Sequence, residues 1–336
     1  MNKLVVTTQV FDENSRLGFF VEWVNKISEQ FESVDVICLE KGCYNVRKNV
    51  TVLSMGKEKG NSKLSQILNF YKYIIERDHD MTFVHMNPIW VVLGWPVWFL
   101  KSTKINMWYA HVSNTLKLKL ATLLCNKVIS STEDSFVIKT KKLNVVGQGI
   151  DTDLFNGEIK YRGEELKIVS TSRISRDKDF LTAFKALKGI KFRYKFDIYG
   201  QAVTSDDITC LNELRSYAKE NSLNVEFKGL VKHDSLPKLY RDYDIFVNQS
   251  RTDSLDKAVL EAMSCRMLVL TSNNSFKKWI SNKFTFIHGD VKGMTEKLYY
   301  LAMSNEVYQE LDINRKIVVD NHSLNSLAKN ISEVLQ

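Results

Sequence analysis

The sequence of 336 residues contains no CxxC pair. Its five cysteines are scattered along the chain, and their number is odd. Such a set argues against both a disulfide framework and zinc ligation, so we expect no metal site and a reducing compartment. The cysteines are Cys38, Cys43, Cys125, Cys210 and Cys265.

Two common nucleotide-binding patterns are also missing. The chain contains neither GxGxxG nor GxxxxGK followed by Ser or Thr, which argues against a dinucleotide dehydrogenase and against a P-loop enzyme. The loop after the first predicted strand, residues 12–18, has a single glycine, Gly18. A loop of this kind before a helix can approach a phosphate, but this one is poor in the glycines that would help it to do so.

No apolar run is long enough to span a bilayer. The most apolar stretch, Ile89 to Leu100, has about 12 residues, against the ~20 that a spanning helix needs. It fits a buried helix, and its three tryptophans also fit contact with a membrane interface. Residues 4–8 look like a first strand, so we expect no signal peptide.

What is present is the composition of a globular protein. Hydrophobic residues make up 44% and charged residues 26%, which suffices for a sizeable core, and the length favours two domains. The formal net charge of +8 suits anionic partners, namely nucleic acid, a phospholipid surface or phosphorylated small molecules.

Short apolar runs alternate with helical patterns, which indicates βαβ units and parallel sheets. The pattern restarts after a polar stretch at 156–165. We therefore predict a Rossmann-like domain over 1–157 and a second over 158–320. Residues 321–336 form a C-terminal helix, and one interpretation is that it packs back on the first domain. Expected strands are 4–8, 34–39, 50–53, 82–85, 105–110, 127–130, 143–146, 166–170, 196–199, 225–227, 245–247 and 267–270.

The loop that follows the first strand of the second domain is a candidate anion site. It reads Ser172-Arg173-Ile174-Ser175-Arg176-Asp177-Lys178 and precedes a predicted helix. Arg173 and Lys178 can converge on a phosphate at the helix N-terminus, where free N–H groups favour anions. A solvated basic loop is the alternative interpretation.

A second candidate is the segment 246–263, where a strand, a polar loop and a helix follow one another. Glu261 lies about two turns inside the predicted helix and is flanked by apolar residues, so a buried carboxylate there needs a hydroxyl or cation partner. Asp253 precedes it by eight positions. The alternative is an N-cap at Asp253 or Ser254 with Glu261 facing solvent.

Two histidines end predicted strands of the first domain. His111 follows Trp108-Tyr109-Ala110, and His85 follows Phe83-Val84. Loops at the carboxyl ends of parallel strands are where open α/β sheets bind ligands. A single histidine is nevertheless more often structural.

Together these segments resemble the retaining glycosyltransferases of family 4, also called group 1, which have the GT-B fold. The resemblance implies two Rossmann-like domains that face each other across a cleft. It covers most of the second half, and residues 147–155 look like the family's segment that joins the domains. The matching segments are Ser172-Arg173-Ile174 with Lys178, Ile198-Tyr199-Gly200, residues 225–229, Leu239-Tyr240, residues 244–247 and residues 259–263.

The resemblance implies roles for these residues. Arg173 and Lys178 match the pair that holds the donor diphosphate, and Glu261 matches the acid that binds the ribose hydroxyls. His111 looks like the histidine near the transferred sugar, and catalysis would use positioning and charge in place of a metal or cofactor. The family's loops around the nucleotide base are matched here by Gly200, Gly229, Leu230 and Val231.

The segment before Glu261 departs from the family pattern. The family often has a glutamate where Asp253 stands, and its glycine-rich turn is replaced by Asp253-Ser254-Leu255-Asp256. Donor contacts are still expected from Ser254, Leu255 and Asp256. Either Asp253 or Asp256 would take the role of the acid that the family often places eight residues before the ribose-binding glutamate.

The sequence thus predicts a cytoplasmic transferase that moves a hexose or a related sugar from a UDP- or GDP-sugar to a glycan or lipid-linked acceptor. The product would be a surface polysaccharide or glycoconjugate. Two alternatives are a non-catalytic binding protein on the same fold and a nucleic-acid-binding protein, although no nucleic-acid motif is present. A lysine cluster in the first domain fits either an anionic membrane surface, with peripheral attachment to its inner face, or a solvated basic face. It comprises Lys117, Lys119, Lys127, Lys139, Lys141 and Lys142.

Overall fold

The computed structural model describes residues 2–15, 17–251 and 254–335. The chain divides into two compact units. The first domain comprises Met1–Gly149 with Leu324–Gln336, and the second comprises Ile150–Ser323. The expected boundary at 157/158 therefore lies inside the second unit.

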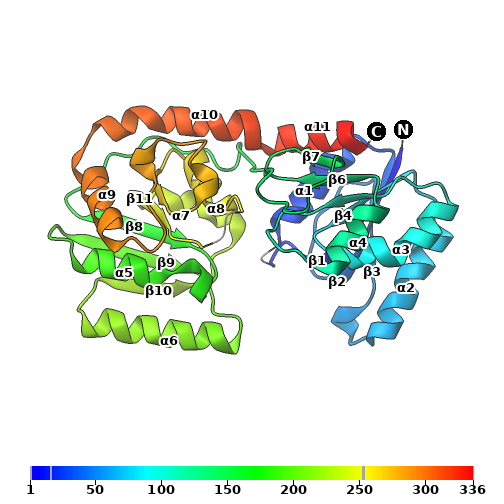
Figure 1. The fold of residues 1–336 in the computed structure, drawn as a ribbon, viewed down its shortest axis with the longest axis horizontal. Helices are drawn as coiled ribbons and strands as arrows, with labels where there is room; N and C mark the ends of the chain where they lie inside the picture. The colour runs from blue at the N-terminus through cyan, green and yellow to red at the C-terminus, as the bar shows by residue number, and fades with distance from the viewer. Residues whose placement is uncertain (1, 16, 252–253, 336) are drawn as a thin grey trace. The chain divides into compact units, whose positions relative to one another are not determined.

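The described part of the first domain contains a sheet of seven strands in the order β3-β2-β1-β4-β5-β6-β7, and all its neighbours pair in parallel (Figure 1). The order reverses direction beside β1, as in doubly wound α/β folds. The strands are β1 Lys3–Phe11, β2 Ser33–Lys41, β3 Val50–Ser54, β4 Met81–His85, β5 Asn106–Trp108, β6 Lys127–Ser130 and β7 Leu143–Val145.

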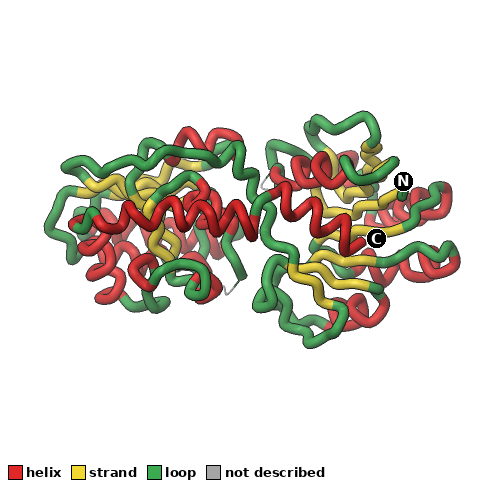
Figure 2. The backbone as a smooth tube through the Cα atoms, turned by 90° about the horizontal axis from the view of Figure 1, so that it is seen from above, coloured by secondary structure: helices red, strands yellow, loops and turns green. Residues whose placement is uncertain are grey.

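Helices cover both faces of this sheet, because alternate residues of a strand point to opposite faces. Leu4 and Val6 of β1 pack in one core with α1 and α11, whereas Val5 packs in another with α2, α3 and α4. The C-terminal helix α11 thus lies on the first domain, beside α1 (Figure 2). The helices are α1 Phe19–Ser28, α2 Lys63–Glu76, α3 Ile89–Leu100, α4 Leu116–Leu124 and α11 Leu324–Leu335.

The second domain repeats this design with a five-stranded parallel sheet in the order β10-β9-β8-β11-β12 among its described residues. All five strands were expected from the sequence. They are β8 Leu166–Thr171, β9 Tyr194–Tyr199, β10 Val225–Gly229, β11 Ile245–Asn248 and β12 Leu268–Thr271.

Polar caps mark where two helices of the second domain begin. Thr204 and Asp207 form a reciprocal capping box at the start of α6, and Asp290 accepts from the backbone N–H of Gly293 at the start of α9. The helix α9 is not among the elements expected from the sequence. The helices are α5 Phe180–Lys188, α6 Ser205–Glu220, α7 Leu236–Tyr240, α8 Lys257–Ser264, α9 Val291–Met303 and α10 Leu311–His322.

No helix within the described residues has the length and apolar character that a membrane span requires.

Candidate functional site

The strand order of the second domain defines where a ligand is expected. The order reverses between β8 and β11, so the chain leaves these two strands toward opposite sides, and open α/β sheets bind ligands at such a point on their carboxyl edge. These loops are residues 172–179 and 249–256. Five described residues that the sequence predicts for the site therefore lie at this switch point: Arg173, Lys178, Ser254, Leu255 and Asp256.

Lys178 is held in place by the loop opposite it. Its Nζ lies 3.0 Å from Oδ1 of Asp256 and 3.3 Å from Oγ of Ser250. The other carboxylate oxygen of Asp256 accepts from Nδ2 of Asn248, at 2.9 Å. The backbone N–H of Arg251 donates to the carbonyl of Asp177, which also joins the two loops. The ammonium group is therefore fixed at the switch point before any ligand arrives.

Arg173 is the more available of the two cations. Its side chain is 43% exposed and lies 3.8 Å from Asp177 and 3.9 Å from Asp207, both beyond hydrogen-bonding distance. Asp207 is committed to the cap of α6: burial acts to raise its pKa, but the backbone N–H groups of Thr204 and Val203 and the charge of Arg173 lower it overall. The guanidinium of Arg173 can therefore turn to an incoming anion without leaving a close ion pair.

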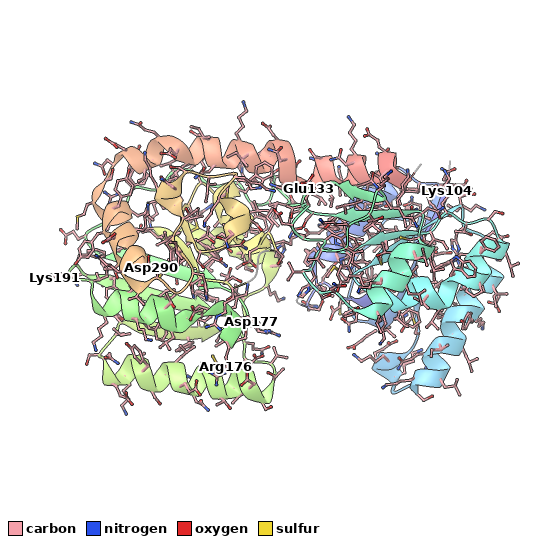
Figure 3. The ribbon with its side chains drawn as sticks, viewed as in Figure 1. Lys104, Glu133, Arg176, Asp177, Lys191 and Asp290 are labelled. Atoms are coloured by element: carbon pink, nitrogen blue, oxygen red, sulfur yellow. The ribbon has the colours of Figure 1, made fainter. Side chains whose placement is uncertain are left out.

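Arg176, in the same loop, is engaged differently. Its guanidinium forms two hydrogen bonds of 3.0 Å to Glu213 of α6 and approaches Asp206 at 3.3 Å. Figure 3 shows Arg176 and Asp177 at one end of the second domain, close to α6. Arg176 thus anchors the loop to α6, and Arg173 remains the arginine that can contact a ligand.

Gly200 has a steric reason to be glycine. A Cβ at this position would lie 1.8 Å from the carbonyl oxygen of Ser172, which no side chain could tolerate. Its N–H donates to the carbonyl of Gly229, which has a left-handed φ of 77°. The loops after β8, β9 and β10 therefore pack backbone against backbone. Beside them Leu230 is exposed and Val231 is half-buried.

Glu261 is buried on α8, with only 4% of its surface exposed. Its Oε1 lies 2.9 Å from Nε2 of His233, which follows β10. The alternative that Glu261 faces solvent is therefore wrong. The pKa of Tyr240 is raised well above its ordinary value, first by burial and then by the charge of Glu261. The sequence prediction did not include His233, whose contact joins positions 28 apart.

The segment before α8 contains three described residues that the sequence predicts for the donor site, Ser254, Leu255 and Asp256. Leu255 is buried, and the carbonyl of Ser254 accepts from Nδ2 of Asn273 at 2.7 Å. Asp256 occupies the N-cap position of α8 without a side-chain cap bond, because its carboxylate is used on Lys178 and Asn248. Asp253 lies outside the described residues.

The two histidines of the first domain differ in burial. His85 is buried, stacks on Phe20 at 4.0 Å and lies 3.3 Å from the hydroxyl of Thr8, as expected of a structural residue. His111 is exposed and lies beyond the end of β5, where it forms an isolated bridge with Phe136. Of the two, His111 is the one with a ring open to a ligand.

Two lysines of the expected basic cluster are engaged elsewhere. Nζ of Lys142 donates to the carbonyls of Thr122, Leu123 and Cys125, which end α4, and Lys127 donates to the carbonyl of Val334 in α11. Cations near a helix C-terminus satisfy its free carbonyls. The cluster as predicted is therefore wrong for these two members.

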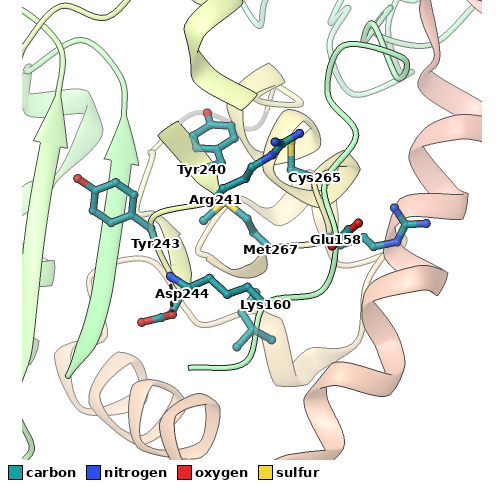
Figure 4. A pocket seen from close by; sticks show the side chains of 10 residues that line it. Glu158, Lys160, Tyr240, Arg241, Tyr243, Asp244, Cys265 and Met267 are labelled. Carbon is teal, nitrogen blue, oxygen red and sulfur yellow. Dashed lines mark ion pairs between the residues drawn. The ribbon is translucent and has the colours of Figure 1, made fainter. Parts of the chain in front are cut away.

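A small pocket also lies at the opposite edge of the second sheet (Figure 4). Tyr243 and Asp244 precede β11, and Met267 precedes β12, so the pocket is at the amino ends of the strands. Asp244 already pairs with Lys160 at 3.4 Å and accepts from the N–H of Lys167 at 2.8 Å. These contacts connect the polar stretch at 156–165 to the sheet, so the switch point remains the candidate site.

Most of the second domain matches a known protein family. Residues 165–304 match the family model described as Glycosyl transferases group 1. Mannosylfructose-phosphate synthase of Agrobacterium fabrum is 26% identical over 163 residues, which cover 42% of this chain and 36% of that enzyme. The alignment thus spans little more than a third of the relative's length.

Solved structures resemble the whole chain. Anabaena HepE, solved in complex with UDP and glucose, superposes with a TM-score of 0.80 at 14% identity, covering 100% of this chain and 99% of that one. Sucrose-phosphate synthase from Thermosynechococcus elongatus gives a TM-score of 0.80 at 13% identity, with 99% and 98% covered. WaaG, a glycosyltransferase involved in lipopolysaccharide biosynthesis, gives 0.72 at 10%, with 99% of each chain covered.

Proposed function

We propose that this chain, a GT-B protein whose second domain is of the glycosyl transferases group 1 family, transfers a sugar from a nucleotide-sugar donor. The expected fold and the resemblance to family 4 are both confirmed. The observation that carries the proposal is the switch point of the second domain. There a fixed lysine and an available arginine occupy one loop. A buried glutamate lies on α8, and the lysine contacts Asp256, the N-cap residue of that helix.

The donor diphosphate would contact Arg173 and Lys178. Arg173 offers a planar fork to phosphate oxygens, and Lys178 is already fixed by Asp256 and Ser250. Because Asp256 neutralises part of the lysine charge in the unliganded protein, donor binding would replace or share that ion pair. In UDP-glucose or GDP-mannose the diphosphate is the leaving group, so the two cations would stabilise the charge that develops on it.

Glu261 would bind the ribose hydroxyls of the donor. Its carboxylate is buried and has one described partner nitrogen on His233, which leaves acceptor capacity on the second oxygen. A carboxylate that accepts from two neighbouring hydroxyls is a common ribose contact. Gly200 and Gly229 would allow the base to approach the backbone, and Leu230, Val231, Ser254 and Leu255 would complete its surroundings.

The proposed chemistry retains the configuration of the anomeric carbon. The bond from this carbon to the diphosphate oxygen breaks, and the bond to the acceptor hydroxyl oxygen forms on the same face. The acceptor proton passes to the departing diphosphate, so no further reactant is needed. Asp253 or Asp256 would take the role of the family's acid that precedes the ribose-binding glutamate. Charge and positioning of the side chains would replace a metal. Proton NMR of the product and turnover in EDTA test both statements.

The acceptor would bind the first domain, with His111 near the transferred sugar. A glycan or a lipid-linked sugar fits a transferase for surface polysaccharide or glycoconjugate synthesis, acting in the cytoplasm or at the inner face of the membrane. Neighbours such as WaaG, whose printed role is in lipopolysaccharide biosynthesis, support this class of acceptor.

The decisive experiment is a panel of UDP-, GDP- and ADP-sugars. We expect one nucleotide class to raise the midpoint of thermal unfolding and to undergo slow donor hydrolysis. Arg173→Ala should lower kcat/KM by about 10²–10³-fold. The Arg173→Ala and Glu261→Ala variants test the alternative. If both still bind the donor, and the donor raises their unfolding midpoint as it does that of the wild type, the non-catalytic alternative replaces this proposal.

A further inference from the structure

Three neighbouring helices of the first domain are apolar on two sides. The inner sides of α2, α3 and α4 pack on one face of the sheet, in the core that contains Val5. The helices also contact each other in the order α2, α3, α4 (Figure 1). Their outer sides carry eight exposed apolar residues: Leu64, Leu68 and Ile75 on α2, Phe99 and Leu100 on α3, and Leu116, Leu120 and Leu123 on α4. We call these eight residues the outer apolar face.

The spacing of these residues makes continuous stripes. On α4 the exposed leucines follow each other at intervals of four and three residues, while Leu118 and Ala121 between them are buried. On α2 the exposed residues are spaced by four and seven. Both intervals return to the same side of a helix. Leu100 and Leu116 are each 83% exposed, so these stripes contribute little to the core and need another explanation.

The charge on the same helices has one sign. Together α2, α3 and α4 contain four lysines and a single acid, Glu76, which is the last residue of α2. The lysines are all exposed: Lys63, Lys72, Lys117 and Lys119. Trp95 stacks on the exposed ring of Phe99 at 5.1 Å, which places an indole beside the outer apolar face.

We propose that the outer apolar face docks on an anionic lipid bilayer. Apolar stripes flanked by lysines fit the boundary between acyl chains and acidic headgroups, where tryptophan is also favoured. A second copy of the chain would fit less well, because a symmetric contact would bring lysines of both copies together. The proposal does not depend on the transferase activity, since none of these residues belongs to the donor site.

The test is flotation with vesicles of phosphatidylcholine that contain either no or about 30 mol% phosphatidylglycerol. The full chain should bind the anionic vesicles, and binding should weaken at high salt. Leu100→Gln/Leu116→Gln/Leu123→Gln should reduce the bound fraction at least tenfold. Lys117→Gln/Lys119→Gln should remove the preference for phosphatidylglycerol. These positions are strongly exposed, so the variants should unfold at the same temperature as the wild type.

A matched control replaces three exposed apolar residues of the second domain, in Val203→Gln/Ile208→Gln/Ile313→Gln. This variant should bind vesicles like the wild type. Absence of wild-type binding to anionic vesicles at low salt, or unchanged binding of the leucine variant, overturns the proposal. It is also overturned if light scattering shows a dimer that the leucine variant dissociates. Protection by nucleotide sugars, measured on the same samples, reports separately on the donor site.

Discussion

The outer helices of the two domains differ although both domains are parallel sheets covered by helices. In the first domain α2 and α4 expose apolar residues in stripes, and α3 exposes Phe99 and Leu100 at its C-terminal end. In the second domain the exposed side of α6 is polar and charged, with Asp206 and Glu213 paired to Arg176, and Ile208 is its one strongly exposed apolar residue among those described. The fold therefore does not require an apolar outer surface, and under our proposal the apolar residues of the first domain serve membrane docking.

The carboxyl edges of the two sheets also differ. In the second domain this edge holds Arg173 and Lys178, and the backbones of its loops meet closely at Gly200. In the first domain the loop after β1 is bonded to the loop after β2: Asp12 accepts from the backbone N–H of Cys43, and Glu13 accepts from that of Asn45. Under our proposal the donor therefore binds the second domain, and the acceptor binds the first.

The largest expected effect comes from an arginine pair within one loop. Arg173→Ala should lower kcat/KM by about 10²–10³-fold, because it removes a cation aimed at developing charge. Arg176→Ala, whose guanidinium is engaged by α6, should change kcat/KM less than about fivefold. Steady-state kinetics with the identified donor measures both. Equal losses in the two variants would mean that the loop as a whole, and not Arg173, carries the chemistry.

Acid should act first on the second domain. Burial, and then the charge of Lys278, lower the pKa of His322 to about 4, so this histidine is neutral in the folded protein at pH 6.5. As pH falls from about 6.5 to 4, the unfolded chain binds a proton that the folded chain does not. The free energy of unfolding should then fall by about 3 kcal/mol. Urea unfolding at several pH values measures this loss.

His322→Leu should remove most of this pH dependence while changing stability little at pH 7.5, because neither nitrogen of the imidazole has a hydrogen-bond partner within the described structure. The first domain has the opposite kind of group in Asp35. Burial acts to raise the pKa of Asp35, but His79 and Arg77 lower it overall. The contribution of this carboxylate to the free energy of unfolding is therefore lost only as pH falls through the lowered pKa. If His322→Leu keeps the full acid sensitivity, another group controls the second domain.

Gly200 tests how closely the loops of the second domain must meet. Gly200→Ala should destabilise the second domain by about 2 kcal/mol and weaken donor binding, because the added Cβ displaces the carbonyl of Ser172. Gly163→Ala is the matched control, since its Cβ would have no neighbour within 4 Å. Urea unfolding and donor titration report the two effects. Similar behaviour of both variants would contradict a steric role for Gly200.

Much of the second domain was predictable because its strands are short apolar runs and its cations directly follow them. The partner of Glu261 was not predictable: His233 is one histidine in a polar loop, and only the folded β10 connection brings it to α8. The roles of Lys127 and Lys142 were mistaken for the same reason, since their acceptors are carbonyls that the sequence does not place. The helix α9 did leave a signal, with buried Met294, Leu298 and Leu301 spaced for one side of a helix.

The smallest predicted effect separates positioning from contact at the ribose site. His233 would orient Glu261 without touching the donor, so His233→Ala should raise the donor KM about tenfold and change kcat little, a loss of ~1.4 kcal/mol. His233→Gln keeps a side-chain N–H donor and should restore much of the affinity. His111→Ala in the first domain should instead lower kcat with donor KM unchanged. If His233→Ala lowers kcat and leaves KM unchanged, Glu261 does not bind the donor through this pair.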